Sequence, residues 1–182
     1  LPTIGATGEI KTKPTQHSVA ALRSIGISPN IIIARADQDV DKSLCEKIAL
    51  FCDVEKDSVI PMKTADVLYE VPLLLEKLGV GELMLGKLGL KSKQKPNMRP
   101  WKKLVEEVRK PKPTIQVALV GKYVELQDAY MSVREALKHA ALANSVEVEI
   151  NWVHSADLEK NKGWDIVKKA DAILVPGGFG SR

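Results

Sequence analysis

Apolar residues in the first half of the chain come in short runs separated by polar stretches, which predicts alternating strands and helices. Residues 30–35 are a nearly continuous apolar run, typical of a strand buried on both faces. Residues 59–60 predict a second, shorter strand. Two further helices are expected at residues 65–69 and 72–77.

A helix is expected between the two strands, ending near residue 51. Asp41 or Ser43 offers the side-chain oxygen that caps a helix start. The residues at helical spacing, which should form its inner face, are Leu44, Ile48 and Phe51 or Cys52.

The second half of the chain repeats this kind of pattern with longer elements. Strands are expected at residues 115–120, 146–150 and 172–175, and helices at 129–143 and 165–169. A β-α-β-α-β order predicts a parallel sheet with its site beyond the carboxyl ends of the strands. The fold class is therefore α/β in both halves.

Between the halves, residues 91–113 contain nine Lys or Arg, two Glu and four Pro. This composition favours an interdomain linker with a short helix over residues 101–108. A nucleic-acid-binding patch is the alternative. Only Trp101 offers an aromatic ring there, so the linker is preferred.

The overall composition is that of an ordinary globular protein, with 45% hydrophobic and 27% charged residues among 182. It excludes a disordered chain, a collagen-like repeat and a disulfide-rich miniprotein. The net charge of +4 suits anionic metabolites as readily as nucleic acid. No apolar run approaches the roughly 20 residues that span a bilayer, so no membrane contact is expected.

Cys45 and Cys52 lie seven residues apart. On one helix they would be separated by a rise of roughly 10 Å, too far for a disulfide. Free thiols suit a reducing cytosol, so a cytoplasmic protein is expected.

Residues 8–18 (GEIKTKPTQHS) combine two lysines, two threonines, a glutamine and a histidine just before a helix expected to start near Ser18. Ammonium groups and the free N–H groups of a helix start are what a triphosphate binds. A solvated basic turn would have a similar composition. The glycine spacing of a P-loop is absent.

Metal sites are not expected. Asp37, Asp39 and Asp41 resemble the opening of a calcium loop, but Lys42 and Ile48 occupy the positions that need Gly and Glu. The three histidines show no zinc-ligand spacing. The aspartates are better explained as a solvated loop and a helix start.

Two further motifs are open to a chemical interpretation. Lys47 and Phe51 lie at i and i+4 on one helix face, either as a core ring with a lysine extended to solvent or as contacts for a nucleobase and its phosphate. Residues 176–180 (PGGFG) follow a strand and either form a tight turn or present backbone N–H groups to an oxyanion.

Four segments together resemble the CTP synthase family from end to end: residues 8–19, 47–52, 120–130 and 172–180. The resemblance implies that residues 1–90 are the later part of an ATP-dependent, P-loop-like amidoligase domain. Residues 91–113 would be the linker, and residues 114–182 the opening of a class I glutamine amidotransferase domain.

The resemblance also implies an activity, the amination of UTP to CTP with ATP, Mg²⁺ and ammonia from glutamine, and roles for particular residues. CTP would be a feedback inhibitor, GTP an activator, and the assembly a homotetramer. The expected UTP or CTP contacts are Lys11, Thr12, Lys13, Pro14, Thr15, Gln16, Lys47 and Phe51. The expected ATP contacts are Lys63, Thr64 and Ala65. Gly177 and Gly178 would form the oxyanion region, with Gly178 also contacting glutamine.

The family's phosphate loop, magnesium carboxylates and catalytic Cys have no counterpart in these residues. We therefore expect the 182 residues to be a part of a longer enzyme and inactive alone. A glutamine amidotransferase-like partner subunit is the alternative, which residues 176–180 would satisfy but residues 1–90 would not.

Overall fold

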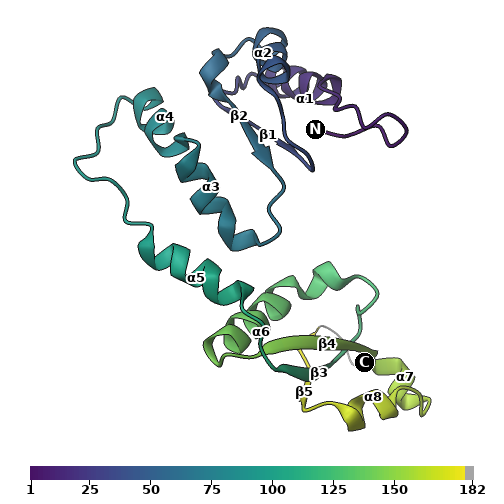
Figure 1. Ribbon diagram of the computed structural model, residues 1–182. Helices are drawn as coiled ribbons and strands as arrows, with labels where there is room; N and C mark the ends of the chain where they lie inside the picture. Colours follow the sequence, from purple (N-terminus) through teal and green to yellow (C-terminus); the bar gives the residue numbers. More distant parts are fainter. Residues whose placement is uncertain (179–182) are drawn as a thin grey trace. The chain divides into compact units, whose positions relative to one another are not determined.

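The computed structural model describes residues 1–178 and divides the chain into two compact units, Leu1–Glu106 and Glu107–Arg182. Both units are α/β and each has its own parallel sheet (Figure 1). The predicted fold class is confirmed. Within residues 1–178, no helix has the length and apolar character needed to cross a bilayer.

The first unit is built on two parallel strands, β1 (Ile32–Ala36) and β2 (Val59–Lys63), paired from Ile32 with Val59 to Ala36 with Lys63. Between them run α2 (Lys42–Phe51) and a short 3₁₀ turn, η1 (Lys56–Ser58). Asp41 caps α2, because its carboxylate accepts the Leu44 N–H at 2.8 Å. Both strands and this helix agree with prediction.

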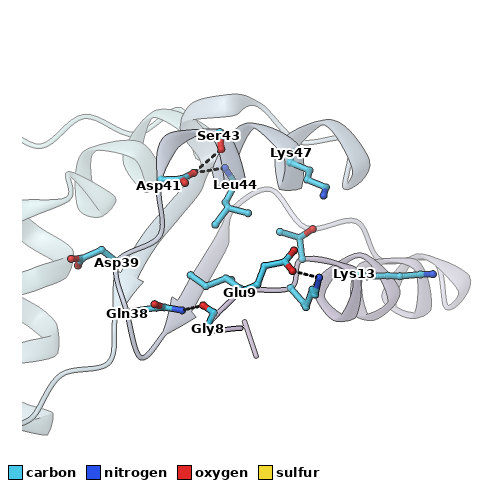
Figure 2. A pocket seen from close by; sticks show the side chains of 12 residues that line it. Gly8, Glu9, Lys13, Gln38, Asp39, Asp41, Ser43, Leu44 and Lys47 are labelled. Carbon is cyan, nitrogen blue, oxygen red and sulfur yellow. Dashed lines mark hydrogen bonds and ion pairs between the residues drawn. The ribbon is translucent and has the colours of Figure 1, made fainter. Parts of the chain in front are cut away.

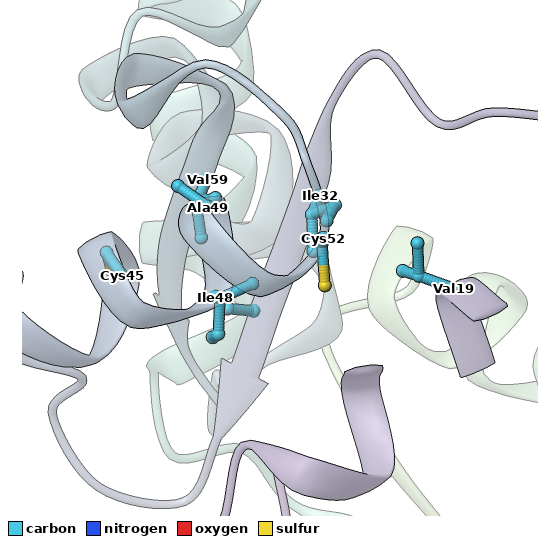
Figure 3. Packing of buried hydrophobic residues seen from close by; sticks show 8 residues of the cluster. Val19, Ile32, Cys45, Ile48, Ala49, Cys52 and Val59 are labelled. Carbon is cyan, nitrogen blue, oxygen red and sulfur yellow. The ribbon is translucent and has the colours of Figure 1, made fainter. Parts of the chain in front are cut away.

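The core of the first unit lies between this sheet, α1 (Lys13–Ser24) and α2 (Figure 3). Its members from α2 are Cys45, Ile48 and Ala49, joined by Cys52, the C-cap residue that follows the helix. Phe51 is 60% exposed, so its alternative placement on the inner face was wrong. Cys52 follows Ile48 by four residues and takes the inward position, which turns Phe51 to solvent.

Both cysteine thiols are free, as predicted, and both are buried. Burial raises the pKa of Cys45 and of Cys52. The thiols therefore act as small apolar core groups rather than as nucleophiles.

Two helical predictions in the first unit need correction, and one helix was not predicted. Helix α1 (Lys13–Ser24) begins five residues before Ser18, because proline is accommodated in a first helical turn. Residues 65–69 are not a helix, and a 3₁₀ turn, η2 (Leu68–Glu70), leads instead into α3 (Val71–Lys77). Helix α4 (Val80–Lys87) was not predicted, since its two glycines disrupt the pattern.

Helix α5 (Arg99–Arg109) is longer than the helix predicted for residues 101–108. The Trp101 indole N–H donates to the Tyr69 carbonyl at 2.6 Å and fixes the start of α5 near η2. The Lys112 ammonium donates to the carbonyls of Glu107 and Lys110 at the other end. A cation on these last carbonyls stabilises the helix terminus.

The second unit is a three-stranded parallel sheet in the order β4-β3-β5. Its strands are β3 (Thr114–Gly121), β4 (Glu147–His154) and β5 (Ala172–Leu174). Strand β4 is longer than predicted because Trp152 and Val153 continue the ladder beside Leu119 and Val120.

Four helical segments accompany this sheet. They are η3 (Gln127–Tyr130), α6 (Met131–Ala143), α7 (Ser155–Glu159) and α8 (Trp164–Lys169). The predicted helix at 129–143 begins as the 3₁₀ turn η3, and α7 was not predicted. A buried cluster of Ala118, Val120, Val153 and Val167 joins α8 to one face of the sheet.

Candidate functional site

A cavity of about 420 Å³ lies in the first unit (Figure 2). Residues 8–13 form one side, and the loop that follows β1 forms another, with Gln38, Asp39 and Asp41. Helix α2 contributes Leu44 and Lys47. The cavity is thus placed at the carboxyl end of a parallel strand, where α/β proteins bind ligands.

Three lysines and three carboxylates line this cavity: Lys11, Lys13 and Lys47, and Glu9, Asp39 and Asp41. The Lys11 ammonium lies 2.6 Å from the Glu9 carboxylate. This hydrogen bond and the charge of Lys11 hold the pKa of Glu9 below its ordinary value. Asp41 is engaged by the start of α2, and the Leu44 N–H lowers its pKa too.

The start of α1 carries no side-chain cap. Thr12 occupies the N-cap position and is buried, but its hydroxyl accepts from the Gln16 amide at 3.2 Å instead of from a helix N–H. An uncapped start places partial positive charge beside Lys11 and Lys13. This combination is suited to an anion with several oxygens.

The predicted triphosphate contacts fall into two groups. Lys11, Thr12, Lys13 and Lys47 line the cavity. The other group belongs to the first turns of α1 and does not line the cavity: Pro14, Thr15 and Gln16. Phe51 lies one turn beyond Lys47 on α2, with its ring exposed.

The predicted ATP contacts lie at the end of β2, also outside this lining. Lys63 is the last residue of β2 and is exposed. The Thr64 hydroxyl donates to the Asp37 carboxylate at 2.8 Å and joins the ends of the two strands. Ala65 is half-buried.

Sequence reasoning missed the contribution of the loop after β1. The Gln38 amide donates to the Gly8 carbonyl at 2.7 Å, which links this loop to residues 8–13. Asp39 lines the same cavity. The position just after a buried parallel strand was the signal that could have identified them.

A second cavity, of about 440 Å³, lies in the second unit. It lies at the carboxyl edge of the sheet and is lined from three places: the end of β3 with residues 120–123, residues 129–130, and residues 175–178, joined by Ser155. Gly177 and Gly178 belong to this lining, and Cβ atoms built on them would meet nothing within 4 Å. Phe179 and Gly180 of the same motif lie outside the described residues.

Most of the residues that line this second cavity are uncharged. Lys122 is the charged residue among its described lining, and its ammonium lies 5.3 Å from the centroid of the Tyr123 ring. At the end of β4, the His154 imidazole Nδ1 accepts the Ala156 N–H at 3.2 Å and caps α7. Residues 1–178 contain no group of three His, Cys, Asp or Glu arranged to hold a metal ion.

Comparison with known proteins matches both units. Residues 1–90 match the family described as CTP synthase N-terminus, and residues 125–182 match the family described as glutamine amidotransferase class-I. The whole chain is 52% identical to a CTP synthase of Dehalococcoides mccartyi, 49% to one of Methanocaldococcus jannaschii and 47% to one of Ruminiclostridium cellulolyticum. It covers 33%, 35% and 34% of these relatives, about a third of their length.

Proposed function

The chain belongs to the CTP synthase family, and on this premise we propose that the protein carrying it aminates UTP to CTP with ATP, using ammonia released from glutamine. The observation that carries the proposal is the pairing of two unlike cavities in one chain. One is rich in lysines beside an uncapped helix start, and the other contains a Gly-Gly loop at a strand end.

The reaction needs a triphosphate anchor and an ammonia source. ATP phosphorylates the C4 oxygen of the uracil ring, and ammonia then displaces the phosphate. In this proposal Lys11, Lys13 and the start of α1 hold the UTP or CTP triphosphate, and Thr12, Pro14, Thr15 and Gln16 shape that turn.

Helix α2 supplies a second contact. Lys47 reaches the nucleotide from the other wall of the cavity. The exposed Phe51 ring offers a face for the CTP base. The same geometry contradicts the alternative in which Phe51 is a core residue.

ATP binding is assigned to Lys63, Thr64 and Ala65. Lys63 is the last residue of β2, and Thr64 and Ala65 follow it. The triphosphate segment, residues 8–13, lies beside the loop after β1. Because β1 and β2 are parallel neighbours, both nucleotides would lie at the carboxyl end of one sheet. Mg²⁺ is expected with ATP, but residues 1–178 contain no cluster of three His, Cys, Asp or Glu that could hold it.

Glutamine hydrolysis is assigned to the second cavity. The backbone N–H groups of Gly177 and Gly178 would stabilise the oxyanion that forms during acyl transfer, with Gly178 contacting glutamine. The absence of side chains at both positions lets the main chain approach the substrate.

The domain assignment follows the two functions. Residues 1–90 belong to the amidoligase domain, 91–113 to the linker and 114–182 to the amidotransferase domain. We further propose a cytoplasmic homotetramer with CTP as feedback inhibitor and GTP as activator, and with neither nucleic acid nor membrane as a partner.

The test is CTP formation by the full-length protein from UTP, ATP and Mg²⁺, with either glutamine or ammonia. Lys11→Ala should abolish both activities, and Gly178→Ala should abolish the glutamine-dependent activity alone. Lys103→Ala, an exposed lysine of α5, is the matched control and should retain both. Residues 1–182 alone should form no CTP.

Two results would contradict the proposal. If the wild-type protein forms no CTP from either nitrogen source, the amidotransferase-like partner subunit becomes the better assignment. If Lys11→Ala retains normal UTP dependence, the triphosphate lies elsewhere.

A further inference from the structure

The main chain that leaves β3 is held by one phenol group. The Tyr130 hydroxyl oxygen accepts the Lys122 N–H at 3.0 Å and the Tyr123 N–H at 3.3 Å. These two residues follow Gly121, the last residue of β3, and line the second cavity. A single side chain therefore satisfies two consecutive backbone donors in the cavity wall.

The phenol itself is fixed by its surroundings. Tyr130 is 8% exposed, and its ring lies 6.2 Å from the Trp152 ring of β4, tilted by 32°. A Cβ built on Gly121 would lie 2.6 Å from the Tyr130 hydroxyl. The close approach requires glycine at 121, so the strand end, the turn and the ring form one packed unit.

The turn held in this way carries Lys122, the charged side chain among the cavity's described lining. An amino acid such as glutamine brings an α-carboxylate into its site, and a positioned cation can bind it. Displacement of the turn would therefore weaken substrate binding. The oxyanion groups belong to a separate segment, residues 177–178.

We propose that Tyr130 is a positioning residue of the glutamine site, acting through the backbone of Lys122 and Tyr123. The inference rests on the proposed function, because it assigns the second cavity to glutamine. Its consequence is specific: loss of the phenol oxygen raises the KM for glutamine and leaves kcat little changed.

The test uses Tyr130→Phe in the full-length protein, because phenylalanine keeps the ring packing and removes the acceptor. We expect roughly a tenfold rise in the KM for glutamine, because the turn loses both hydrogen bonds to the phenol oxygen. The kcat at saturating glutamine should stay within about twofold. Ammonia-dependent CTP formation by the same sample should be unchanged, which controls for the integrity of the ligase site.

Trp152→Phe is the comparison for a purely structural effect. It reduces the packing behind the ring and keeps the phenol oxygen, so it should lower the melting temperature without raising the KM for glutamine. The inference is overturned if Tyr130→Phe leaves this KM unchanged, if it lowers both activities equally, or if Trp152→Phe raises the KM as much. Wild-type protein that forms no CTP from ammonia or glutamine would refute the proposed function instead.

Discussion

The two cavities have nearly the same volume, about 420 and 440 Å³, and both adjoin the carboxyl end of a parallel strand. Their linings differ sharply. Half of the residues lining the first are lysines or carboxylates, whereas small or aliphatic residues and two tyrosines make up most of the second lining. The comparison teaches that the strand ends set where each cavity lies, whereas the loops set its chemistry. In our proposal the first cavity binds a polyanion and the second binds a small amino acid.

The two sites also differ in what holds them in shape. The first is organised by side-chain contacts, such as Lys11 with Glu9 and Gln38 with the Gly8 carbonyl. The second is organised by close packing around Gly121 and Tyr130. Ligand binding at the first site should therefore depend on ionic strength. The second site should instead be sensitive to the addition or loss of a single methyl group.

The largest effect is expected from Lys11→Ala combined with Lys13→Ala. Loss of two cations from one triphosphate site should weaken UTP binding by roughly 100-fold, since a hydrogen bond to a charged group contributes about 1.5–3 kcal/mol. The KM for glutamine should stay within about twofold. Equilibrium binding of UTP to the full-length protein measures the effect, and a loss below about threefold would contradict the assignment.

Gly121→Ala should damage the second site alone. The added Cβ would lie 2.6 Å from the Tyr130 hydroxyl, and such overpacking costs about 1–3 kcal/mol of unfolding free energy. Glutamine-dependent activity should fall while ammonia-dependent activity persists.

Gly86→Ala on α4 is the matched control for this substitution. The added Cβ would meet nothing within 4 Å, and residue 86 lies in a helix. Alanine has the higher helix propensity, so the free energy of unfolding should be equal or higher. Denaturant unfolding of the two variants gives the comparison. Equal stability of Gly121→Ala and wild type would show that the packing is looser than inferred.

In the unmodified protein, salt should affect substrate binding at the first site more than at the second. Raising the ionic strength from about 0.05 to 0.2 M shortens the screening length and should weaken UTP binding several-fold. The KM for glutamine should change by less than about twofold. Titrations with UTP and with glutamine over this range of ionic strength test the prediction. Equal salt dependence for the two substrates would contradict it.

The smallest effect is expected from Asp41→Asn. Asparagine keeps an acceptor for the Leu44 N–H but removes the charge. Because the folded-state pKa of Asp41 is lowered, its carboxylate stabilises the fold above the unfolded value of about 3.9, and this stabilisation is lost as pH falls through the folded value.

The variant should therefore melt slightly lower than wild type at pH 7, and the gap should close below about pH 4. Thermal unfolding between pH 3 and 7 measures this gap. A gap that stays constant with pH would mean that the charge of Asp41 has no part in the cap.

Local signals in the sequence were sufficient for most of the framework. Continuous apolar runs predicted β1 and β3, and Asp41 before an amphipathic stretch predicted α2. These features depend on neighbours within a few residues, so they can be read without knowledge of the packing. Residue type and spacing left the roles of Lys11, Lys13 and Lys47 open, and the family resemblance predicted them as triphosphate contacts. The structure places all three in the lining of one cavity.

Tertiary packing decided two features that the spacing of residues along the sequence left open. Phe51 and Cys52 both suited the inner face of α2, and only the position of the sheet turned Cys52 inward. Helix α4 could not be predicted because Gly81 and Gly86 have a low helix propensity. In the folded chain the tertiary context outweighs this propensity.

By itself the sequence determined the strands, most of the helices, the motifs and the chemical character of the two halves. Only the tertiary structure placed Gln38 against Gly8 and the Tyr130 phenol against the turn after Gly121. The physical reason is the range of the interactions. Caps and helical or strand periodicity act over a few residues, whereas these contacts join segments whose separation in space is set by the sheet.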